Sequence, residues 1–281
     1  MPSNDLLPAV LGLIAAISWG TGDFCGGLAS KRTTAFGVVI VSQAVGLLLL
    51  LALALLLHEP VPSTASLAWG AAAGLMGGLA VTALYMALAG GKMGIAAPIT
   101  AVLGAALPVL FGVAIQGPPA PLQVAGLFVA LVGVALLSLS GGKSAPASRS
   151  LGLAVFAGLG IGVFLILLRQ AGTTALFWPL VAARVASVTI IFAGTLAARQ
   201  PWRPGRKLLP VIALAGVMDL GGNVFFILAT QTGRLDIAAI LSSLYPAATV
   251  LLAAIILKER VSGVQGAGIV AVLIAIGLIV S

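Results

Sequence analysis

Three ionisable residues lie inside long apolar runs of the sequence, and they are the strongest candidates for chemistry. They are Asp23, Arg184 and Asp219. An ionised side chain at the centre of a bilayer costs about 2.5–3.5 kcal/mol on insertion scales, so such residues usually face a cavity or a partner. Two carboxylates and one guanidinium could bind a charged solute, join two helices as an ion pair, or carry a coupling proton in exchange for a substrate.

Asp219 is the first candidate for a substrate or coupling-ion site. It lies about 11 residues into its apolar run, which puts it roughly 16 Å deep, near the middle of a roughly 30 Å hydrocarbon core. Asn223 follows at i+4 and shares its helical face. Gly221 and Gly222 lie between them and allow a backbone or a ligand to approach closely. The competing interpretation of Asp219 is a structural ion pair.

Arg184 and Asp23 complete the set of deep charges. Arg184 is roughly 15 Å deep in its own run and needs a counter-ion, which only Asp23 or Asp219 can supply. It either joins two helices or captures a substrate carboxylate, and both hold in turn if a substrate competes for the pair. Asp23 has Trp19 one turn earlier on the same face. The competing interpretation of Asp23 is a structural one, in which its carboxylate makes a satisfied polar contact near the cytoplasmic end of the helix.

Further polar side chains could line the same cavity, namely Tyr85, Ser242, Ser243 and Tyr245. Serine hydroxyls in helices more often bond to their own backbone or pack between helices than bind ligands. Pro246 removes one backbone N–H from the interior of an apolar run and is the predicted hinge.

Charges near the ends of apolar runs have simpler interpretations. Glu59 and Glu259 are predicted to be loop charges, and Asp236 is a first-turn acid favoured by the helix dipole. The single cysteine, Cys25, and the single histidine, His58, argue against a disulfide, a zinc site or a catalytic histidine. Walker A, HExxH and GxSxG sequences are absent. We therefore expect no metal, no cofactor, no ATP and no enzymatic activity.

The composition requires a bilayer around these residues. The chain has 14 basic and 6 acidic residues among 281, and 61% of it is hydrophobic. A soluble domain carries roughly 25% charged residues. The net charge of +8 is distributed singly and in pairs, which argues against nucleic acid as a partner. The expected partners are the lipid bilayer and a small-molecule substrate, and no oligomer is required.

Ten apolar segments approach the roughly 20 residues that a spanning helix needs. They cover residues 6–29, 34–57, 66–89, 94–116, 121–140, 151–169, 175–198, 207–230, 235–257 and 262–281. We predict an all-α membrane protein in which residues 1–140 and 151–281 are two five-helix repeats around a central cavity. Residues 141–150 are the polar linker between them.

The two halves repeat each other in sequence. An offset of 142 aligns AGLMGG at 73–78 with AGVMDL at 215–220. Near the start of each half we predict an offset of 140, which pairs Trp19 with Leu159, Gly20 with Gly160, Gly22 with Gly162 and Asp23 with Val163. Five is an odd number, so the second half enters from the opposite face. Inverted repeats of this kind are typical of secondary transporters.

The basic residues predict the orientation. Eleven fall on one side of the ten-helix arrangement, namely Lys31, Arg32, Lys92, Lys143, Arg149, Arg199, Arg203, Arg206, Lys207, Lys258 and Arg260. Only Arg169 and Arg234 fall on the other. Because cytoplasmic loops carry the excess of Lys and Arg, we expect both termini on the outer side of the cell (inner) membrane.

The segment from Ile237 to Val280 resembles the last two helices of EamA-type members of the drug/metabolite transporter superfamily. The residues that carry the resemblance are Ser242, Ser243, Pro246, Glu259, Arg260, Gln265 and Gly268, together with Trp19 and Gly20 in the first run. In the first half Gly117 stands where Glu259 does in the second, so any role of the Glu-Arg pair applies to the second half alone.

The resemblance implies a secondary transporter that moves an amino acid or a small amphipathic compound across the membrane by alternating access, with export as the expected direction. Two other classes remain as alternatives: an intramembrane enzyme or lipid-handling protein, and a membrane scaffold that does not transport. Solute flux in proteoliposomes distinguishes them.

Overall fold

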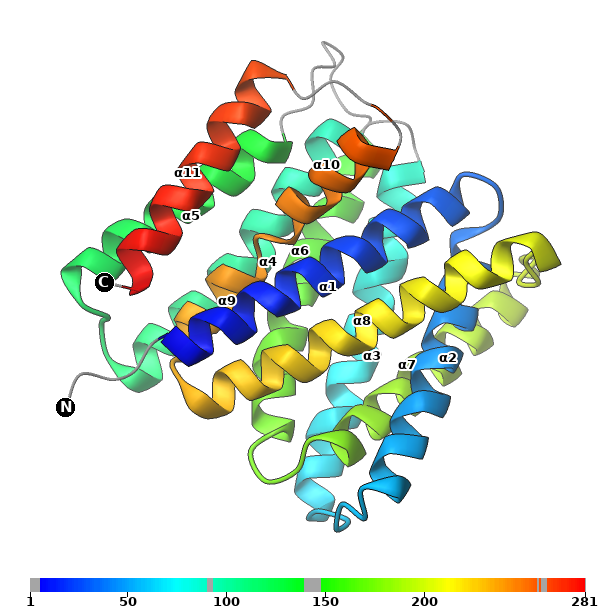
Figure 1. Ribbon diagram of the computed structural model, residues 1–281. Helices are drawn as coiled ribbons and strands as arrows, with labels where there is room; N and C mark the ends of the chain where they lie inside the picture. The colour runs from blue at the N-terminus through cyan, green and yellow to red at the C-terminus, as the bar shows by residue number, and fades with distance from the viewer. Residues whose placement is uncertain (1–5, 90–92, 139–147, 257, 259–261, 281) are drawn as a thin grey trace.

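The computed structural model describes residues 6–89, 93–138, 148–256, 258 and 262–280, and in this part of the chain helices are joined by loops, without a strand (Figure 1). In chain order the helices are α1 (Leu6–Ser30), α2 (Ala35–Leu56), α3 (Thr64–Ala89), α4 (Met93–Gln116), α5 (Pro121–Ser138), α6 (Ser148–Ala171), α7 (Phe177–Ala197), the 3₁₀ turn η1 (Arg206–Leu208), α8 (Leu209–Thr232), α9 (Leu235–Ser242), α10 (Tyr245–Ile256) and α11 (Gly263–Val280).

These helices agree with the ten predicted spans. Seven segments are long and apolar enough to cross a membrane by length and composition, and the three shorter apolar helices are Thr100–Gln116, Pro121–Leu136 and Gly263–Ala275. The predicted linker 141–150 lies outside the described residues up to residue 147, and residues 148–150 form the first turn of α6.

The ninth span differs from the prediction because it consists of two helices, α9 and α10, separated at Ser243 and Leu244. Pro246 has no N–H to donate to the carbonyl of Ser242. The hydroxyls of Ser242 and Ser243 donate to the carbonyls of Ala239 and Ile240 at 3.1 and 2.7 Å, and such bonds compete with the backbone ladder. Two serines and a proline together account for the break.

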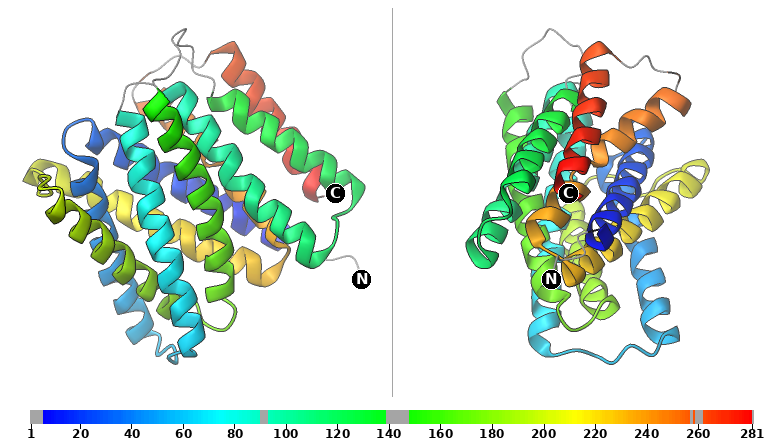
Figure 2. Two further views of the ribbon diagram at one scale, coloured as in Figure 1. Left: turned by 180° about the vertical axis from the view of Figure 1, so that it is seen from behind. Right: turned by 60° about the vertical axis from the view of Figure 1, so that its left-hand side comes forward.

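The helix contacts follow an inverted two-fold pattern. α1 packs along α8 as α6 packs along α3, and α1 contacts α9 and α10 as α6 contacts α4. α2 pairs with α7 and α5 with α11, at opposite flanks of the molecule (Figures 1 and 2). Each half has five spans, so this exchange of halves also reverses their direction across the membrane.

The structural register shows that the offset of 140 between α1 and α6 is wrong. Gly20 lies against Thr249 of α10, and Gly162 lies against Leu107 of α4. Both Gly20 with Gly162 and Leu107 with Thr249 are related by an offset of 142. Gly160, the predicted partner of Gly20, instead faces Ala80 of α3. The offset of 142 therefore holds through these helices as well.

A second pair of contacts gives the same register. Gly22 lies against the backbone of Asp219, and Phe164 covers Gly77. The offset of 142 relates Gly22 to Phe164 and Gly77 to Asp219, so the two contacts are equivalent under exchange of the halves.

The corrected register changes which residues of α6 are the repeat equivalents of Trp19 and Asp23 in α1. The repeat equivalent of Asp23 is Leu165 rather than Val163, and that of Trp19 is Ile161 rather than Leu159. Both replacements are apolar, so the acid of α1 still has no counterpart in the second half.

Small residues let the two halves approach backbone to backbone. Gly74 of α3 faces the backbone of Ala183 in α7, and its repeat partner, Gly216 of α8, faces the backbone of Ser42 in α2. Helix pairs in membranes pack through such small residues because lipid is as apolar as the helix surface.

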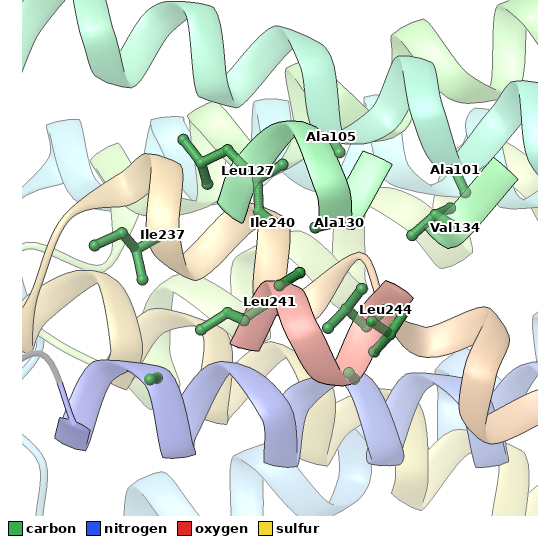
Figure 3. Packing of buried hydrophobic residues seen from close by; sticks show 13 residues of the cluster. Ala101, Ala105, Leu127, Ala130, Val134, Ile237, Ile240, Leu241 and Leu244 are labelled. Atoms are coloured by element: carbon green, nitrogen blue, oxygen red, sulfur yellow. The ribbon is translucent and has the colours of Figure 1, made fainter. Parts of the chain in front are cut away.

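The short helix α9 is the most deeply buried element. Residues 235–241 are all fully buried. Figure 3 shows Ile240 beside Leu127 and Ala130 of α5, while Leu241 points toward α1, where it packs against Gly12. The outer surface is apolar in turn: Phe128 of α5 is 68% exposed and Leu273 of α11 is 63% exposed. Exposed side chains of this type suit contact with lipid.

Two acids near the ends of apolar runs, Glu59 and Asp236, make specific contacts within the fold. Glu59, predicted to be a loop charge, accepts hydrogen bonds from the N–H groups of Leu176, Phe177 and Trp178 at the start of α7, at 2.7–3.1 Å. Asp236 is fully buried and pairs with Arg234 at 2.7 Å. Arg234 also donates to the carbonyl of Gly117 at 2.6 Å, which ties α9 to the end of α4. Glu259 and Arg260 lie outside the described residues.

Candidate functional site: the central cavity

A cavity lies between the two halves, and side chains from α1 to α4 and from α6 to α10 border it. The empty space among these side chains is about 880 Å³, a figure that includes the open space at its mouth. Of the nine residues predicted to face a cavity, eight border it: Trp19, Asp23, Arg184, Asp219, Asn223, Ser242, Ser243 and Tyr245.

The lining is divided into a polar and an apolar wall. Arg184, Ser187 and Gln43 come from α7 and α2, Asp219 and Asn223 from α8, and Asp23 from α1. Helices α3, α4 and α6 contribute lining that is apolar apart from Thr100, with the side chains of Val81, Leu84, Ala101, Ile161, Phe164 and Leu165. A solute with a charged end and an apolar body matches this arrangement.

The ion pair between Arg184 and Asp219 is the principal electrostatic feature. Nη2 of Arg184 lies 2.6 Å from Oδ2 of Asp219. The Arg184 side chain is 7% exposed and that of Asp219 is 33% exposed. The guanidinium therefore has the counter-ion that its depth requires, and the carboxylate retains an open side toward the cavity.

α2 holds the guanidinium in place. Nη1 of Arg184 donates to Oε1 of Gln43. A methyl group at Gly46 would lie 3.3 Å from Nε of Arg184, so the glycine leaves the room that the guanidinium occupies. Gln43 and Gly46 were not predicted as site residues. Gln43 is an uncharged residue in an apolar run. Its role becomes apparent only from its hydrogen bond with Arg184 on α7, which is far away in the sequence.

Asn223 and Ser187 each contribute a buried polar oxygen without a hydrogen-bond partner in the described structure. Nδ2 of Asn223 donates to the backbone carbonyl of Asp219 at 2.9 Å, which fixes the amide and leaves its Oδ1 unpaired. Ser187, one turn after Arg184 on α7, has an unpaired hydroxyl. Both residues border the cavity and are almost fully buried. Unpaired buried polar groups are rare because they forfeit hydration, and at a cavity they are free to bond to water or to a ligand.

Asp23 and Trp19 lie on the α1 side of the cavity. Asp23 is close enough to Asp219 for the two like charges to repel. The indole of Trp19 packs over Gly222, where a Cβ would collide with it, and stacks at a tilt on Phe226 with ring centroids 5.7 Å apart. The close approach expected at Gly222 is thus made by Trp19.

The predicted polar residues of the ninth span and of α3 fall in different places. Ser242, Ser243 and Tyr245 flank the break between α9 and α10 and border the cavity. Tyr85 is buried against Gly26 of α1 and is not among the described lining residues, so its role at the cavity remains a prediction. Gly26 supplies the space for its ring because a Cβ there would meet the phenol.

The two halves contribute the same positions to the cavity with different side chains. With the offset of 142, both members of several pairs border it: Trp19 and Ile161, Asp23 and Leu165, Gly77 and Asp219, Val81 and Asn223, Thr100 and Ser242. The cavity thus lies on the pseudo-two-fold axis, and its two carboxylates each belong to a pair whose other member is uncharged, Leu165 for Asp23 and Gly77 for Asp219. In the pair of Thr100 and Ser242 both side chains are hydroxyls. The hydroxyl of Thr100 donates to the backbone carbonyl of Ala154 at 3.0 Å.

Comparison with known proteins agrees with this architecture. The EamA-like transporter family matches the chain twice, over residues 6–139 and 148–281. The chain belongs to the EamA-like transporter family. It is therefore a multi-pass membrane protein of a transporter family, built from two copies of the EamA repeat.

Solved structures add support for the fold alone. A crystal structure of a protein 19% identical to this chain superimposes with a TM-score of 0.75 and covers 96% of this EamA protein and 95% of its own chain. None of the curated proteins matches the sequence.

Proposed function

We propose that this EamA protein is a secondary transporter that exports a small metabolite, an amino acid or a small amphipathic compound, across the inner membrane by alternating access. The observation that carries the proposal is the Arg184–Asp219 ion pair at a cavity between two inverted halves. Inverted repeats allow the cavity to open to either side through reciprocal movement of the halves around a fixed site.

A coupling proton fits the same site. Asp23 and Asp219 lie close together in the cavity, so binding of a substrate cation or of a proton relieves the repulsion between them. A proton gradient would then drive export by exchange, with protons entering as the substrate leaves.

The test is flux in proteoliposomes containing the full chain. A panel of amino acids, sugars and amphipathic amines is loaded and efflux is followed with and without a pH gradient. We expect efflux of at least one amino acid or amphipathic compound, accelerated by an opposing proton gradient. Absence of flux for the whole panel under both conditions would refute the proposal and favour a lipid-handling protein or a scaffold.

The first site prediction is that Asp219→Asn abolishes transport while expression and folding remain intact. The amide preserves the shape of Asp219 but removes the charge that pairs with Arg184 and that could carry a proton. Efflux is measured beside a size-exclusion profile of the purified variant. Normal transport by Asp219→Asn across the pH range would show that the site lies elsewhere.

A further inference from the structure

We propose that the substrate is a small amphipathic zwitterion whose carboxylate takes the place of Asp219 on Arg184, while its ammonium group binds Asp219 together with Asn223. This inference rests on the proposed transport function and assigns the two ends of the substrate to the two sides of an existing ion pair.

The ion pair has one fixed and one exchangeable partner. Arg184 is held by Gln43, fits against Gly46 and is almost fully buried. The Asp219 carboxylate is one-third exposed, and Asn223 bonds to its backbone carbonyl rather than to its side chain. A substrate carboxylate at Arg184 would replace one charge-assisted interaction by another of the same kind. The exchange therefore leaves no buried cation without a counter-ion.

The acceptor side of the site is prepared for an ammonium group. Oδ1 of Asn223 is a buried acceptor without a donor in the described structure, and Asp219 lies one turn earlier on the same helix. When the Asp219 carboxylate no longer pairs with Arg184, the ammonium group of the substrate becomes its new counter-ion. Asp23 lies near enough to Asp219 to add its negative charge to this side.

The charge balance favours a zwitterion with a carboxylate over a phosphate ester. The described lining carries one cation, Arg184, and two carboxylates, Asp23 and Asp219. A zwitterion leaves this sum unchanged, whereas a doubly charged phosphate would face two acids with one guanidinium. The unpaired hydroxyl of Ser187, one turn from Arg184, can donate to the second carboxylate oxygen.

The apolar wall receives the body of the substrate. Val81, Leu84, Ile161 and Leu165 border the same cavity as the ion pair and contribute uncharged, aliphatic lining. Branched aliphatic side chains of this type match an aliphatic substrate body by burial of apolar area.

Three probes with one branched aliphatic body separate the two ends of the site. Leucine carries both charges, 4-methylpentanoate lacks the ammonium group, and 3-methylbutylamine lacks the carboxylate. Dissociation constants are measured by calorimetry on the purified full chain in detergent. For the unaltered protein we expect leucine to bind at least about tenfold more tightly than either relative, because each lost charged hydrogen bond costs that much or more.

Two variants should respond in opposite directions. Asp219→Asn removes the internal competitor, so 4-methylpentanoate should bind about tenfold more tightly while 3-methylbutylamine binds more weakly. Arg184→Gln should weaken both carboxylates by about tenfold or more and leave the amine at least as tightly bound. Glu59→Gln, the same carboxylate-to-amide change at a residue that is not among the lining residues, is the matched control and should change none of the three constants.

The gain of affinity in Asp219→Asn keeps the test decisive even if Arg184→Gln does not fold, since misfolding cannot tighten binding. Weaker binding of 4-methylpentanoate to Asp219→Asn would overturn the inference. So would failure of all three probes to bind the unaltered protein. In either case, efflux of another solute from the panel would leave the transport function standing, so the two proposals fail separately.

Discussion

At the scale of single residues, Glu59 shows how a charge outside the cavity stabilises the fold. Its carboxylate accepts hydrogen bonds from three successive backbone N–H groups at the start of α7. The indole N–H of Trp178 donates to the backbone carbonyl of Glu59 at 2.8 Å. The first N–H groups of a helix have no partner within it, and the helix dipole favours a negative charge there. The loop after α2 thus caps α7 in the other half of the molecule.

We expect Glu59→Gln to lower the free energy of unfolding by about 1–2 kcal/mol, the range for a helix cap and a charge at a helix start. The amide has one acceptor oxygen and no charge. The apparent melting temperature, followed by tryptophan fluorescence, measures the loss. Substrate efflux should stay within about twofold, because Glu59 is not among the lining residues and acts on the fold. An unchanged melting temperature would contradict the capping role.

A sequence marks deep charges clearly, but it does not mark residues whose importance depends on a partner on a distant helix. The cost of charge in a bilayer identified Asp23, Arg184 and Asp219 as special, and all three border the cavity. Gln43 and Ser187 are uncharged, so their cost is too small to mark them in a sequence. Tyr85 is polar at one end only, and its depth in the sequence did not show that Gly26 accommodates its ring.

At the scale of elements, the break between α9 and α10 depends on several neighbouring residues rather than on proline alone. α4 also contains a proline, Pro108, and continues as a helix from Met93 to Gln116. At the break, Ser242 and Ser243 bond to carbonyls of the preceding turn while Pro246 withholds a donor. Pro246 as a hinge of transport remains a prediction.

Pro246→Ala should restore a donor to the carbonyl of Ser242 and extend the helix across the break. We expect slower hydrogen exchange of the amides at residues 243–249, measured by mass spectrometry, and slower efflux because the hinge is stiffer. Pro108→Ala is the matched control, since α4 is already continuous, and should slow exchange far less. Equal protection in both variants would show that the serines alone cause the break.

The register of the repeat shows the limit of matching letters in a glycine-rich sequence. Gly20 and Gly22 match Gly160 and Gly162 by identity, yet the structure requires a shift of two positions. Positions two apart on a helix point to nearly opposite sides, so this shift exchanges the contacted neighbours. The ten segments themselves were predictable because their apolar length and the loops between them are properties of composition.

At the scale of the whole molecule, the described basic residues cluster at one end. The loops after α1 and α7 carry Lys31, Arg32, Arg199, Arg203 and Arg206, while the first turn of α1 and the last turn of α11 lie at the opposite end (Figure 1). At the end with the termini, Arg234 is neutralised by Asp236. The charge imbalance between the two ends is therefore greater than a count of residues indicates.

We expect both termini to face outward. Green fluorescent protein fused after Ser281 should remain dark, because it does not fold after export through the general secretory route, while alkaline phosphatase at the same point should be active. The same reporters fused within the loop after α7, at Gly205, should give the reverse result. Fluorescence from the fusion at Ser281 would show that the C-terminus faces the cytoplasm and that the predicted topology is wrong.

The unequal lining of the cavity has a consequence for the resting state of the transporter. If the two halves were identical in sequence, the arrangements open to either side would be related by symmetry and equal in free energy. Asp219, Asn223 and Trp19 face Gly77, Val81 and Ile161 across the axis, so the two arrangements desolvate different groups. Under the proposed alternating access, the unliganded protein should therefore prefer one of the two arrangements. A few side chains of the cavity, rather than the repeated helices, would set that preference, and substrate binding would act against or along it.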